Sequence, residues 1–355
     1  MKKILILQNE LSPYSVPVYN KIAEHYDLTV GYYLKDKSYG ICNFHKKHFD
    51  YIETCSFVIV KGLKSYVSQF DLVSILPDLH IISYWSLLFM PHSFKITSWS
   101  IGFRVSYVHP YITNRKHVIA DRLIQEFFNR CDANIFYMEK AKEFWKDTNV
   151  DMSKVFVAPN TTEVIPITIE DGNKKDFLFI GTLYKGKGID LLLESFLKAV
   201  KVDGIDNKLH IVGDGEERNE IETFVKEHHM EDKVILHGAI FDEKKLAELF
   251  GISLLCISPT QGGLSCPKSM GYGVPFVTRS DAITGGEIYH ITSGVNGVIY
   301  KHDIDLTSII RDASLNREKY IEMGKRAQKY YYNKATINHM AEGAMSAFDF
   351  ALNIK

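Results

Sequence analysis

The segment Phe177–Gly188 reads FLFIGTLYKGKG, and an amphipathic pattern at Ile189–Val200 follows it directly. A buried strand is predicted to run into a glycine-rich turn, and a helix begins beside Lys187. Glycines let a backbone approach an anion closely, while a helix N-terminus and a lysine supply positive charge. The segment predicts an anion-binding turn that includes Lys187. The alternative is an ordinary strand-to-helix turn with a solvated lysine.

The same turn comes close to a nucleotide-triphosphate P-loop, whose pattern is G-x-x-x-x-G-K-[ST]. Gly181, Gly186 and Lys187 fit that pattern. Gly188, however, stands where a serine or threonine must hold Mg²⁺. An NTPase is therefore disfavoured.

The segment Leu209–Arg218 reads LHIVGDGEER and contains a second glycine-rich turn. Gly213 and Gly215 begin a dinucleotide-binding fingerprint, but Arg218 occupies the position of its third glycine. The two consecutive glutamates before Arg218 would also repel a pyrophosphate. A dehydrogenase is disfavoured, and a tight turn between a strand and a helix explains this segment when it is taken alone.

The segment Ser258–Pro275 reads SPTQGGLSCPKSMGYGVP and predicts a short helix after a glycine-rich loop. Ser265 is expected to be the N-cap of that helix. Gly263 would let a ligand approach the open amides of its first turn. We therefore predict that Gly263, Leu264 and Ser265 bind a phosphate group.

The chain of 355 residues carries 42 basic and 43 acidic side chains, and 46% of its residues are hydrophobic. This length predicts two domains, and the composition excludes a disordered chain and a basic nucleic-acid binder. Five scattered cysteines without a C-x-x-C pair favour neither a zinc site nor a disulfide framework, so a reducing cytosol is expected. The apolar run Ile4–Leu7 stops too early for a signal peptide. We expect a cytoplasmic protein, and attachment to the inner face of the membrane stays open.

Short apolar runs alternate with longer amphipathic segments along the chain, which predicts an α/β fold with parallel sheets. The expected strands are 4–8, 28–33, 56–60, 80–83, 133–137, 155–158, 177–180, 209–212, 234–236, 254–257 and 274–278. The expected helices are 16–25, 117–130, 139–145, 188–200, 216–229, 243–250, 317–332 and 337–351.

A polar stretch at 168–176 is the predicted linker between two domains. The first domain would span 1–167 and the second 177–332, and a helix in 333–355 would pack back on the first domain. Two facing doubly wound domains bind ligands in the crevice at the carboxyl ends of their strands. The ligand sites are therefore expected in the loops that follow the strands.

Taken together and in this order, the three quoted segments resemble the C-terminal domain of retaining GT-B glycosyltransferases of the glycosyltransferase group 1, family 4 (GT4) type. The resemblance covers residues 177–300 well, and it also uses Val234-Ile235-Leu236-His237-Gly238, Met270-x-x-Gly273-x-Pro275 and Gly294-x-Asn296-Gly297. The first half fits more loosely, through Ser12-Pro13-Tyr14, Trp99-x-x-Gly102 and the segment 157–161.

The resemblance implies a GT-B fold of two Rossmann-like domains, with a nucleotide diphosphate sugar in the second and an acceptor mostly in the first. It implies sugar transfer with retention at the anomeric carbon, without an obligatory metal or other cofactor. By position, Lys187 would stabilise the leaving diphosphate, and Gly213 and Gly238 would lie at the nucleotide. The implied partners are a nucleotide-sugar donor and a glycan or lipid-linked acceptor.

Three positions depart from the family pattern. Thr182 stands where relatives have an arginine that pairs with the lysine, and Thr260 and Lys268 replace the two acids of a Glu-x₇-Glu motif. Those acids usually hold donor-sugar hydroxyls and the nucleotide ribose, so donor recognition is expected to differ here. Our hypothesis is that Lys268 supplies the charge missing at Thr182, and the alternative is a surface lysine that points to water.

Glu287 is the nearest spare acid, in the stretch Thr284-Gly285-Gly286-Glu287. One interpretation is a carboxylate that reaches ribose or sugar hydroxyls of the donor. The other is a capping box, with Thr284 as the N-cap and Glu287 three residues further on.

On the acceptor side, Ser12 and Tyr14 lie in the loop after the first strand, which should face the ligand crevice. Many relatives place a histidine in a Trp-x-His-Gly-like stretch, but this chain has isoleucine at that position. His92 and His109 flank it, and Arg104 is placed to pair with an acceptor phosphate. For each of these residues, an ordinary core, turn or surface role is the alternative.

We therefore predict a retaining, metal-independent hexosyltransferase that moves a sugar from a nucleotide diphosphate sugar to a glycan or lipid-linked acceptor. Its product would be a surface polysaccharide or glycoconjugate. The alternative is a GT-B-fold binding subunit with a degenerate site, because three charged site residues are replaced; an epimerase of similar fold is a third interpretation. The persistence of Lys187 and its glycines argues against a degenerate site. The run Tyr330–Tyr332 is interpreted as part of a packed helix, with a membrane-surface patch as the alternative.

Overall fold

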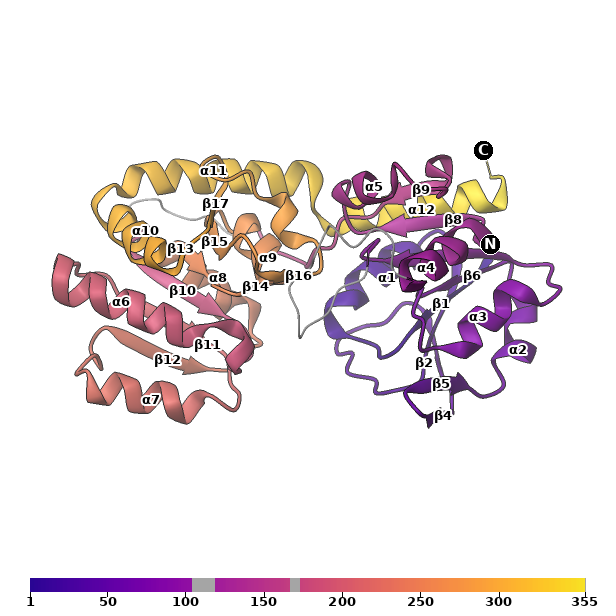
Figure 1. Ribbon diagram of the computed structural model, residues 1–355, viewed down its shortest axis with the longest axis horizontal. Coiled ribbons are helices and arrows are strands. Elements are labelled where there is room, and N and C mark those ends of the chain that lie inside the picture. Colours follow the sequence, from indigo (N-terminus) through magenta and orange to yellow (C-terminus); the bar gives the residue numbers. More distant parts are fainter. Residues whose placement is uncertain (104–118, 167–172, 355) are drawn as a thin grey trace. The chain divides into compact units, whose positions relative to one another are not determined.

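The structure is a computed structural model that describes residues 1–103, 119–166 and 173–354. The chain forms two compact units (Figure 1). The first unit takes in the described residues up to Thr162 and those from Thr336 onward, and the second takes in Glu163 to Ala335. Asp176, at the end of the stretch expected to be a linker, is buried and begins a strand of the second unit.

The first unit is built on a parallel sheet of seven strands. Its strands are β1 (Lys3–Gln8), β2 (Asp27–Tyr32), β3 (His45–His48), β6 (Leu72–Ile75), β7 (Lys95–Ser100), β8 (Ala133–Phe136) and β9 (Val155–Val157). They pair in the order β3-β2-β1-β6-β7-β8-β9. Two further strands, β4 (Tyr51–Thr54) and β5 (Phe57–Val60), form a separate antiparallel hairpin. The helices are α1 (Val16–Ala23), α2 (Leu63–Tyr66), α3 (Ile82–Phe89), α4 (Ile119–Arg130), α5 (Lys140–Trp145) and α12 (Ile337–Leu352).

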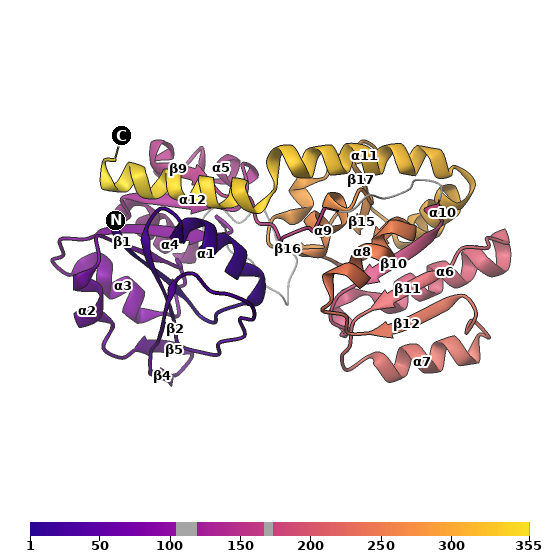
Figure 2. The same ribbon diagram turned by 180° about the vertical axis from the view of Figure 1, so that it is seen from behind.

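Side chains of β1 alternate between the two faces of this sheet, as the pleat of a strand requires. Ile4 and Ile6 belong to the core beneath α1 and α12, and Leu5 and Leu7 belong to the core beneath α3. The C-terminal helix α12 packs on β7, β8, β9 and α1, and both views show it along β8 and β9 (Figure 1, Figure 2). The prediction that the end of the chain crosses back to the first domain is confirmed by this packing.

The second unit repeats the pattern with a parallel sheet of six strands. Its main strands are β10 (Asp176–Ile180), β11 (Leu209–Val212), β12 (Val234–Gly238), β13 (Ser253–Ile257), β15 (Phe276–Arg279) and β17 (Gly297–Tyr300), paired in the order β12-β11-β10-β13-β15-β17. A small second sheet pairs β14 (Gln261–Gly262) with β16 (Ile283–Thr284). The helices are α6 (Ile189–Asp203), α7 (Arg218–Glu227), α8 (Glu243–Ile252), α9 (Ser265–Gly271), α10 (Asp303–Leu315) and α11 (Arg317–Lys334).

Strand β10 divides the core of the second unit into two layers. Phe177 and Phe179 are fully buried among residues of α6, α7 and α10, whereas Leu178 packs in the opposite layer with α8 and α9. Burial on both faces explains why this strand is almost continuously hydrophobic in sequence. The doubly wound α/β class expected from the sequence is confirmed for both units.

The sequence patterns did not predict β6 and β7, two central strands of the first unit. The strand predicted at 80–83 is also wrong. Strand β7 carries Thr97 and Ser98, which are fully buried, and Ser98 Oγ donates a hydrogen bond to Asn134 Oδ1 at 2.6 Å. The strand expected at 80–83 is instead the approach to α3, whose buried Tyr84, Leu87 and Leu88 recur at helical spacing. Polar side chains paired inside a sheet hide a strand from a search for apolar runs.

The aromatic run near the end of α11 contributes to the fold of the second unit. Tyr331 is buried in the core with Tyr272, and the hydroxyl of Tyr330 lies 3.2 Å from Nδ1 of His290. Among the helices that the structure describes, none is both long and apolar enough to cross a bilayer.

Candidate functional site

The glycine-rich turn after β10 has the backbone shape that the sequence predicts. Gly181 and Gly188 adopt positive φ angles, and residues 185–187 form a single 3₁₀ turn before α6. A side chain at Gly188 would place its Cβ 2.8 Å from Cγ2 of Thr260. Thr260 Oγ1 donates a hydrogen bond to the carbonyl oxygen of Gly186 at 2.7 Å. Thr260, at the first acid position of the family motif, therefore holds this turn in place.

Lys187 is half-buried inside the turn. Its Nζ lies 5.9 Å from the ring centre of Tyr184 and 3.5 Å from the position that a Cβ at Gly181 would occupy. Burial lowers the pKa of Lys187 below its ordinary value of 10.5, and the negative charge of Glu287 acts in the opposite direction. An ammonium group that is partly removed from water attracts an incoming anion more strongly than an exposed ammonium group does, because less water screens the two charges.

The side chain of Glu287 is buried, with 4% of its surface exposed. Its Oε2 accepts a hydrogen bond from the hydroxyl of Thr284 at 3.0 Å, and that hydroxyl oxygen accepts from the amide of Gly286 at 3.0 Å. The N-cap of the following 3₁₀ turn is Gly286 rather than Thr284, so the predicted capping box is wrong in its register. Glu287 thus brings a buried negative charge into the electrostatic field of Lys187.

Helix α9 starts one residue away from the expected position. Its N-cap is Leu264, and Ser265 is the first helical residue, so the assignment of Ser265 as N-cap is wrong. The space that a side chain at Gly263 would enter is open, because apart from Gly263 and its two chain neighbours no atom of the described structure lies within 4 Å of it. The phosphate-binding role predicted for residues 263–265 stays a prediction.

Lys268 does not point to water. Its Nζ lies 2.6 Å from Oε1 of Glu243 on α8, and its side chain is only 13% exposed. The hydroxyl of Tyr272 donates a hydrogen bond to the other oxygen of Glu243 at 3.5 Å. The surface-lysine interpretation is therefore wrong, and a carboxylate already balances the charge that we expected to replace an arginine at Thr182. Thr182 itself is exposed.

Gly213 and Gly238 serve the packing of neighbouring turns. The amide of Gly213 donates a hydrogen bond to the carbonyl oxygen of Gly238 at 2.9 Å. A Cβ at Gly213 would lie 1.8 Å from the carbonyl oxygen of Gly181, and one at Gly215 would lie 2.2 Å from that of Leu183. Gly213 and Gly215 are therefore required because the backbones of neighbouring turns touch there. This requirement does not depend on a bound ligand.

A buried chain of polar side chains, which sequence reasoning missed, crosses three strands of this sheet. Asp176 Oδ2 lies 3.3 Å from Nε2 of His210, and Nδ1 of His210 lies 2.9 Å from Nε2 of His237. Asp176 also accepts a hydrogen bond from the amide of Lys208 at 2.8 Å. Burial alone would raise the pKa of Asp176, but the hydrogen bonds from His210 and the Lys208 amide lower it below 3.8.

We expect the second unit to lose stability as the pH falls below 6.5, the ordinary pKa of histidine. Burial, followed by the proximity of His210, lowers the pKa of His237 below its ordinary value of 6.5. As the pH falls, His237 is therefore protonated in the unfolded chain before it is protonated in the folded protein. Its contribution to the free energy of unfolding is complete above pH 6.5 and is lost as the pH falls towards the folded-state pKa. Urea unfolding across this range should show the decline. A His237→Asn variant with an undiminished pH slope would contradict the assignment.

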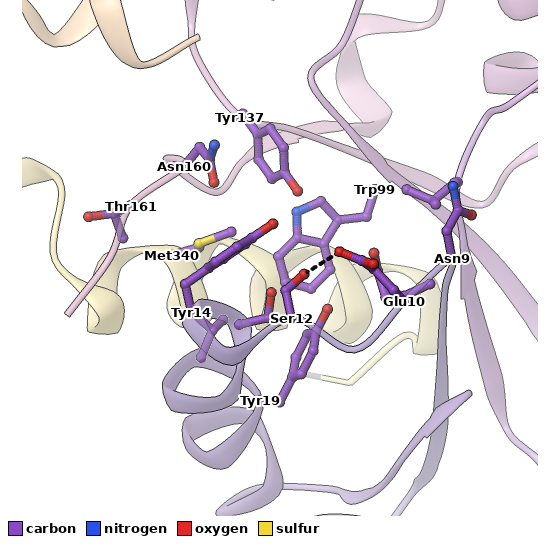
Figure 3. A pocket seen from close by; sticks show the side chains of 14 residues that line it. Asn9, Glu10, Ser12, Tyr14, Tyr19, Trp99, Tyr137, Asn160, Thr161 and Met340 are labelled. Carbon is purple, nitrogen blue, oxygen red and sulfur yellow. Dashed lines mark hydrogen bonds between the residues drawn. The ribbon is translucent and has the colours of Figure 1, made fainter. Parts of the chain in front are cut away.

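The first unit has a pocket at the carboxyl ends of β1, β7 and β8 (Figure 3). Its volume is about 170 Å³. The side chains that line it and that Figure 3 labels are Asn9, Glu10, Ser12, Tyr14, Tyr19, Trp99, Tyr137, Asn160, Thr161 and Met340. Carboxyl ends of parallel strands are where doubly wound folds place their ligands.

Two of the five predicted acceptor-side residues, Ser12 and Tyr14, line this pocket. His92 precedes β7, at the amino ends of the strands, and its Nδ1 lies 2.8 Å from the carbonyl oxygen of Phe94. The structure therefore places His92 away from the pocket, because a whole strand separates the two sheet edges. Arg104 and His109 lie outside the described residues.

The pocket carries a tethered carboxylate that the sequence did not single out. Glu10 Oε2 lies 2.8 Å from Nζ of Lys37, and Glu10 Oε1 accepts a hydrogen bond from Ser12 Oγ at 3.4 Å. Burial, with the nearby hydroxyl of Tyr137, raises the pKa of Tyr19, so its hydroxyl stays protonated. The sequence signal that could have identified Glu10 as a site residue is its position just after a parallel strand.

No group of three or more histidine, cysteine, aspartate or glutamate side chains in the described ranges is arranged to hold a metal ion. The described residues offer a half-buried lysine beside glycine-rich turns in the second unit, and a pocket lined by hydroxyl groups and a carboxylate in the first.

Residues 160–330 match the family described as glycosyl transferases group 1. These residues form a group 1 glycosyl transferase domain. The matched region contains Lys187, Lys268 and Glu287, and among the described residues that line the first-unit pocket it includes Asn160 and Thr161. The recognition made from the glycine-rich segments is confirmed.

A curated relative is N-acetyl-alpha-D-glucosaminyl L-malate synthase from Bacillus anthracis, 24% identical over 237 residues. The match covers 65% of this chain and 55% of that protein, so the chain spans about half the length of this relative.

Solved structures of similar fold include sucrose-phosphate synthase from Thermosynechococcus elongatus, at a TM-score of 0.74 and 14% identity, covering all of both chains. Anabaena HepE in complex with UDP-glucose has a TM-score of 0.70 at 14% identity and covers 98% of this chain and 100% of its own. A TarM variant from S. aureus in complex with UDP and alpha-GlcNAc-glycerol has a TM-score of 0.70 at 15% identity, with the same coverage. These similarities show that this chain has a GT-B fold.

Proposed function

We propose that this protein is a glycosyltransferase that moves a sugar from a nucleotide diphosphate sugar to a hydroxyl group of a glycan or lipid-linked acceptor. The observation that carries the proposal is Lys187, a half-buried cation with a lowered pKa in the glycine-rich turn of a group 1 domain. A half-buried ammonium group placed in this way is suited to stabilise negative charge that develops on a leaving diphosphate.

The proposed reaction is a same-face substitution at the anomeric carbon, with retention of configuration. The bond between the acceptor oxygen and the anomeric carbon forms as the bond from that carbon to the diphosphate oxygen breaks. The acceptor proton passes to the departing diphosphate, whose charge Lys187 and the amides of residues 263–265 would stabilise. No metal or other cofactor has a role in this proposal, and the product would be a surface polysaccharide or glycoconjugate.

The nucleotide site is best tested by calorimetry with UDP, GDP, dTDP and ADP in the presence of EDTA. HepE and TarM were solved with UDP or UDP-sugar, which makes UDP the first ligand to try. Selective binding of one nucleotide without metal supports the proposal. Binding of none of them, or binding that requires Mg²⁺, would contradict it.

A catalytically degenerate binding subunit is the second candidate, and a specific observation favours it. The two positions of the family's paired acids have internal partners, since Thr260 holds the carbonyl of Gly186 and Lys268 pairs with Glu243. Single-turnover assays with the nucleotide sugar selected by calorimetry separate the two candidates, because a binding subunit binds the donor without transferring or hydrolysing it.

A further inference from the structure

The ring of Tyr184 is packed against the turn that carries Lys187. Tyr184 directly precedes the 3₁₀ turn of residues 185–187, and its carbonyl oxygen accepts a hydrogen bond from the amide of Lys187 at 2.9 Å. A Cβ at Gly186 would lie 2.6 Å from Cε2 of the Tyr184 ring. The ring therefore rests directly on the backbone of Gly186, and a side chain at that position would displace it.

The hydroxyl group of Tyr184 fastens the ring to a segment that is distant in sequence. It donates a hydrogen bond to Oε1 of Gln261, which begins β14 and is 77 residues away. Thr260, the residue before Gln261, donates to the carbonyl oxygen of Gly186 at 2.7 Å. Two consecutive residues thus hold the turn at two points, one on the Tyr184 side chain and one on the backbone.

The segment that holds Tyr184 is itself joined to the segment that carries Glu287. Strand β14 pairs with β16 in parallel register, with Gln261 opposite Ile283 (Figure 1). Thr284, the last residue of β16, donates a hydrogen bond from its hydroxyl to Oε2 of Glu287 at 3.0 Å. A continuous series of contacts therefore connects the Tyr184 ring with the buried carboxylate.

The Tyr184 ring and the Glu287 carboxylate both favour the charged form of Lys187. Its Nζ lies 5.9 Å from the centre of the Tyr184 ring, within the range of a cation–π interaction. Burial lowers the pKa of Lys187, and the negative charge of Glu287 opposes that effect. Since a cation–π interaction requires the cation to lie over the ring within about 6 Å, it can position the ammonium group only while the ring is held in place.

We propose that Tyr184 is a positioning residue, whose ring, fastened by Gln261, holds the ammonium group of Lys187 where the leaving diphosphate develops its charge. This inference rests on the proposed function and adds a residue to it. A lysine carries its charge on a flexible four-carbon stem, whereas electrostatic stabilisation of a transition state requires the charge to be in place beforehand. The need is greater here because Thr182 replaces the arginine of the family pattern.

The first test needs no ligand. Hydrogen exchange of the Lys187 and Gly188 amides is measured by NMR in the full chain, because both amides donate hydrogen bonds inside the turn. Tyr184→Phe removes only the hydroxyl group, and both amides are expected to exchange about three- to tenfold faster as the turn opens more often. Unchanged exchange in this variant would overturn the inference, because the hydroxyl group would then not hold the turn.

Tyr320→Phe is the matched control for the exchange experiment. It makes the same chemical change in the same unit, but the hydroxyl that it removes donates to Asp312 in α10 and not to the segment of Gln261. The Lys187 and Gly188 amides should therefore exchange in this variant as they do in the unmodified protein.

The second test separates a positioning role from a structural one. The affinity for the nucleotide that calorimetry selects is measured for Tyr184→Phe, Lys187→Ala and the double variant. Tyr184→Phe is expected to weaken binding about three- to tenfold, and by less than about twofold when residue 187 is already alanine. Tyr184→Leu, which also removes the ring, should weaken binding further, and again only while Lys187 is present.

Two outcomes of the second test would overturn the inference. Equal effects of Tyr184→Phe with and without Lys187 would show that Tyr184 contacts the nucleotide itself or supports the fold. Faster amide exchange without any change in nucleotide affinity would give Tyr184 a structural role alone.

Failure of this inference can be told apart from failure of the proposed function. If a nucleotide binds and Tyr184→Phe changes neither exchange nor affinity, the glycosyltransferase proposal stands and the role of Tyr184 is lost. If none of the four nucleotides binds to the unmodified protein, the proposed function fails, and the positioning role fails with it.

Discussion

Replacing Lys187 with alanine is expected to lower sugar transfer by about 10²- to 10³-fold while the second unit stays folded. The ammonium group is half-buried, and burial has lowered its pKa, so its charge is held at a cost to the free protein. Removing a buried charge of this kind should leave the midpoint of thermal unfolding unchanged or slightly higher. A variant that loses sugar transfer but keeps its thermal stability would show that Lys187 acts in the reaction and not in folding.

Lys185→Ala is the matched control for this experiment. Lys185 lies two residues away in the same turn and is exposed, so its removal should change both transfer and nucleotide affinity by less than about twofold. Lys187→Arg retains the charge in a larger group and should recover only part of the rate. Near-normal turnover in Lys187→Ala would exclude this lysine as the group that stabilises the leaving diphosphate.

Gly213→Ala is expected to destabilise the second unit by about 4 kcal/mol. The new Cβ would lie 1.8 Å from the carbonyl oxygen of Gly181, a distance at which the backbone must move. Gly213 also has φ +148°, a conformation that alanine rarely adopts. Steric overlap and backbone strain act in the same direction, and neither involves a ligand.

Urea unfolding of this variant should be compared with that of Gly251→Ala. Gly251 lies in α8, and no atom of the described structure is within 4 Å of a Cβ placed there, so alanine should stabilise the protein by up to about 1 kcal/mol. If Gly213→Ala instead unfolds like the unmodified protein and only nucleotide affinity falls, Gly213 acts by contacting the nucleotide and the packing explanation is wrong.

Local patterns were sufficient for the elements that are buried on both faces. The segment 177–188 predicted a strand, a glycine turn and a helix, and the structure has β10, the turn and α6 at those places. The patterns failed at β6 because that strand has only four residues, and at β7 because Thr97 and Ser98 are polar residues buried inside the sheet. Satisfaction of such atoms depends on a neighbouring strand that is distant in sequence.

In the candidate site too, the sequence predicted some residue roles from local patterns and could not predict others. Lys187 could be named from its own segment, since a lysine beside glycines at the end of a strand has a local explanation. The roles of Thr260 and Lys268 could not, because their partners, Gly186 and Glu243, are 74 and 25 residues away. The predicted N-caps, Ser265 and Thr284, lie one and two residues from the N-caps in the structure, Leu264 and Gly286. Helix ends are commonly uncertain by one or two residues.

The sequence by itself determined the α/β class, the glycosyl transferase group 1 recognition and the position of the glycine-rich turn around Lys187, because each depends on residues that are neighbours along the chain. Only the tertiary structure decided which polar side chains meet: His210 with His237, Lys268 with Glu243, and Glu10 with Lys37. Parallel strands bring their carboxyl ends together from distant parts of the sequence, so a site made of such ends has no local pattern. The burial that lowers the pKa of Lys187 arises only when those distant segments pack.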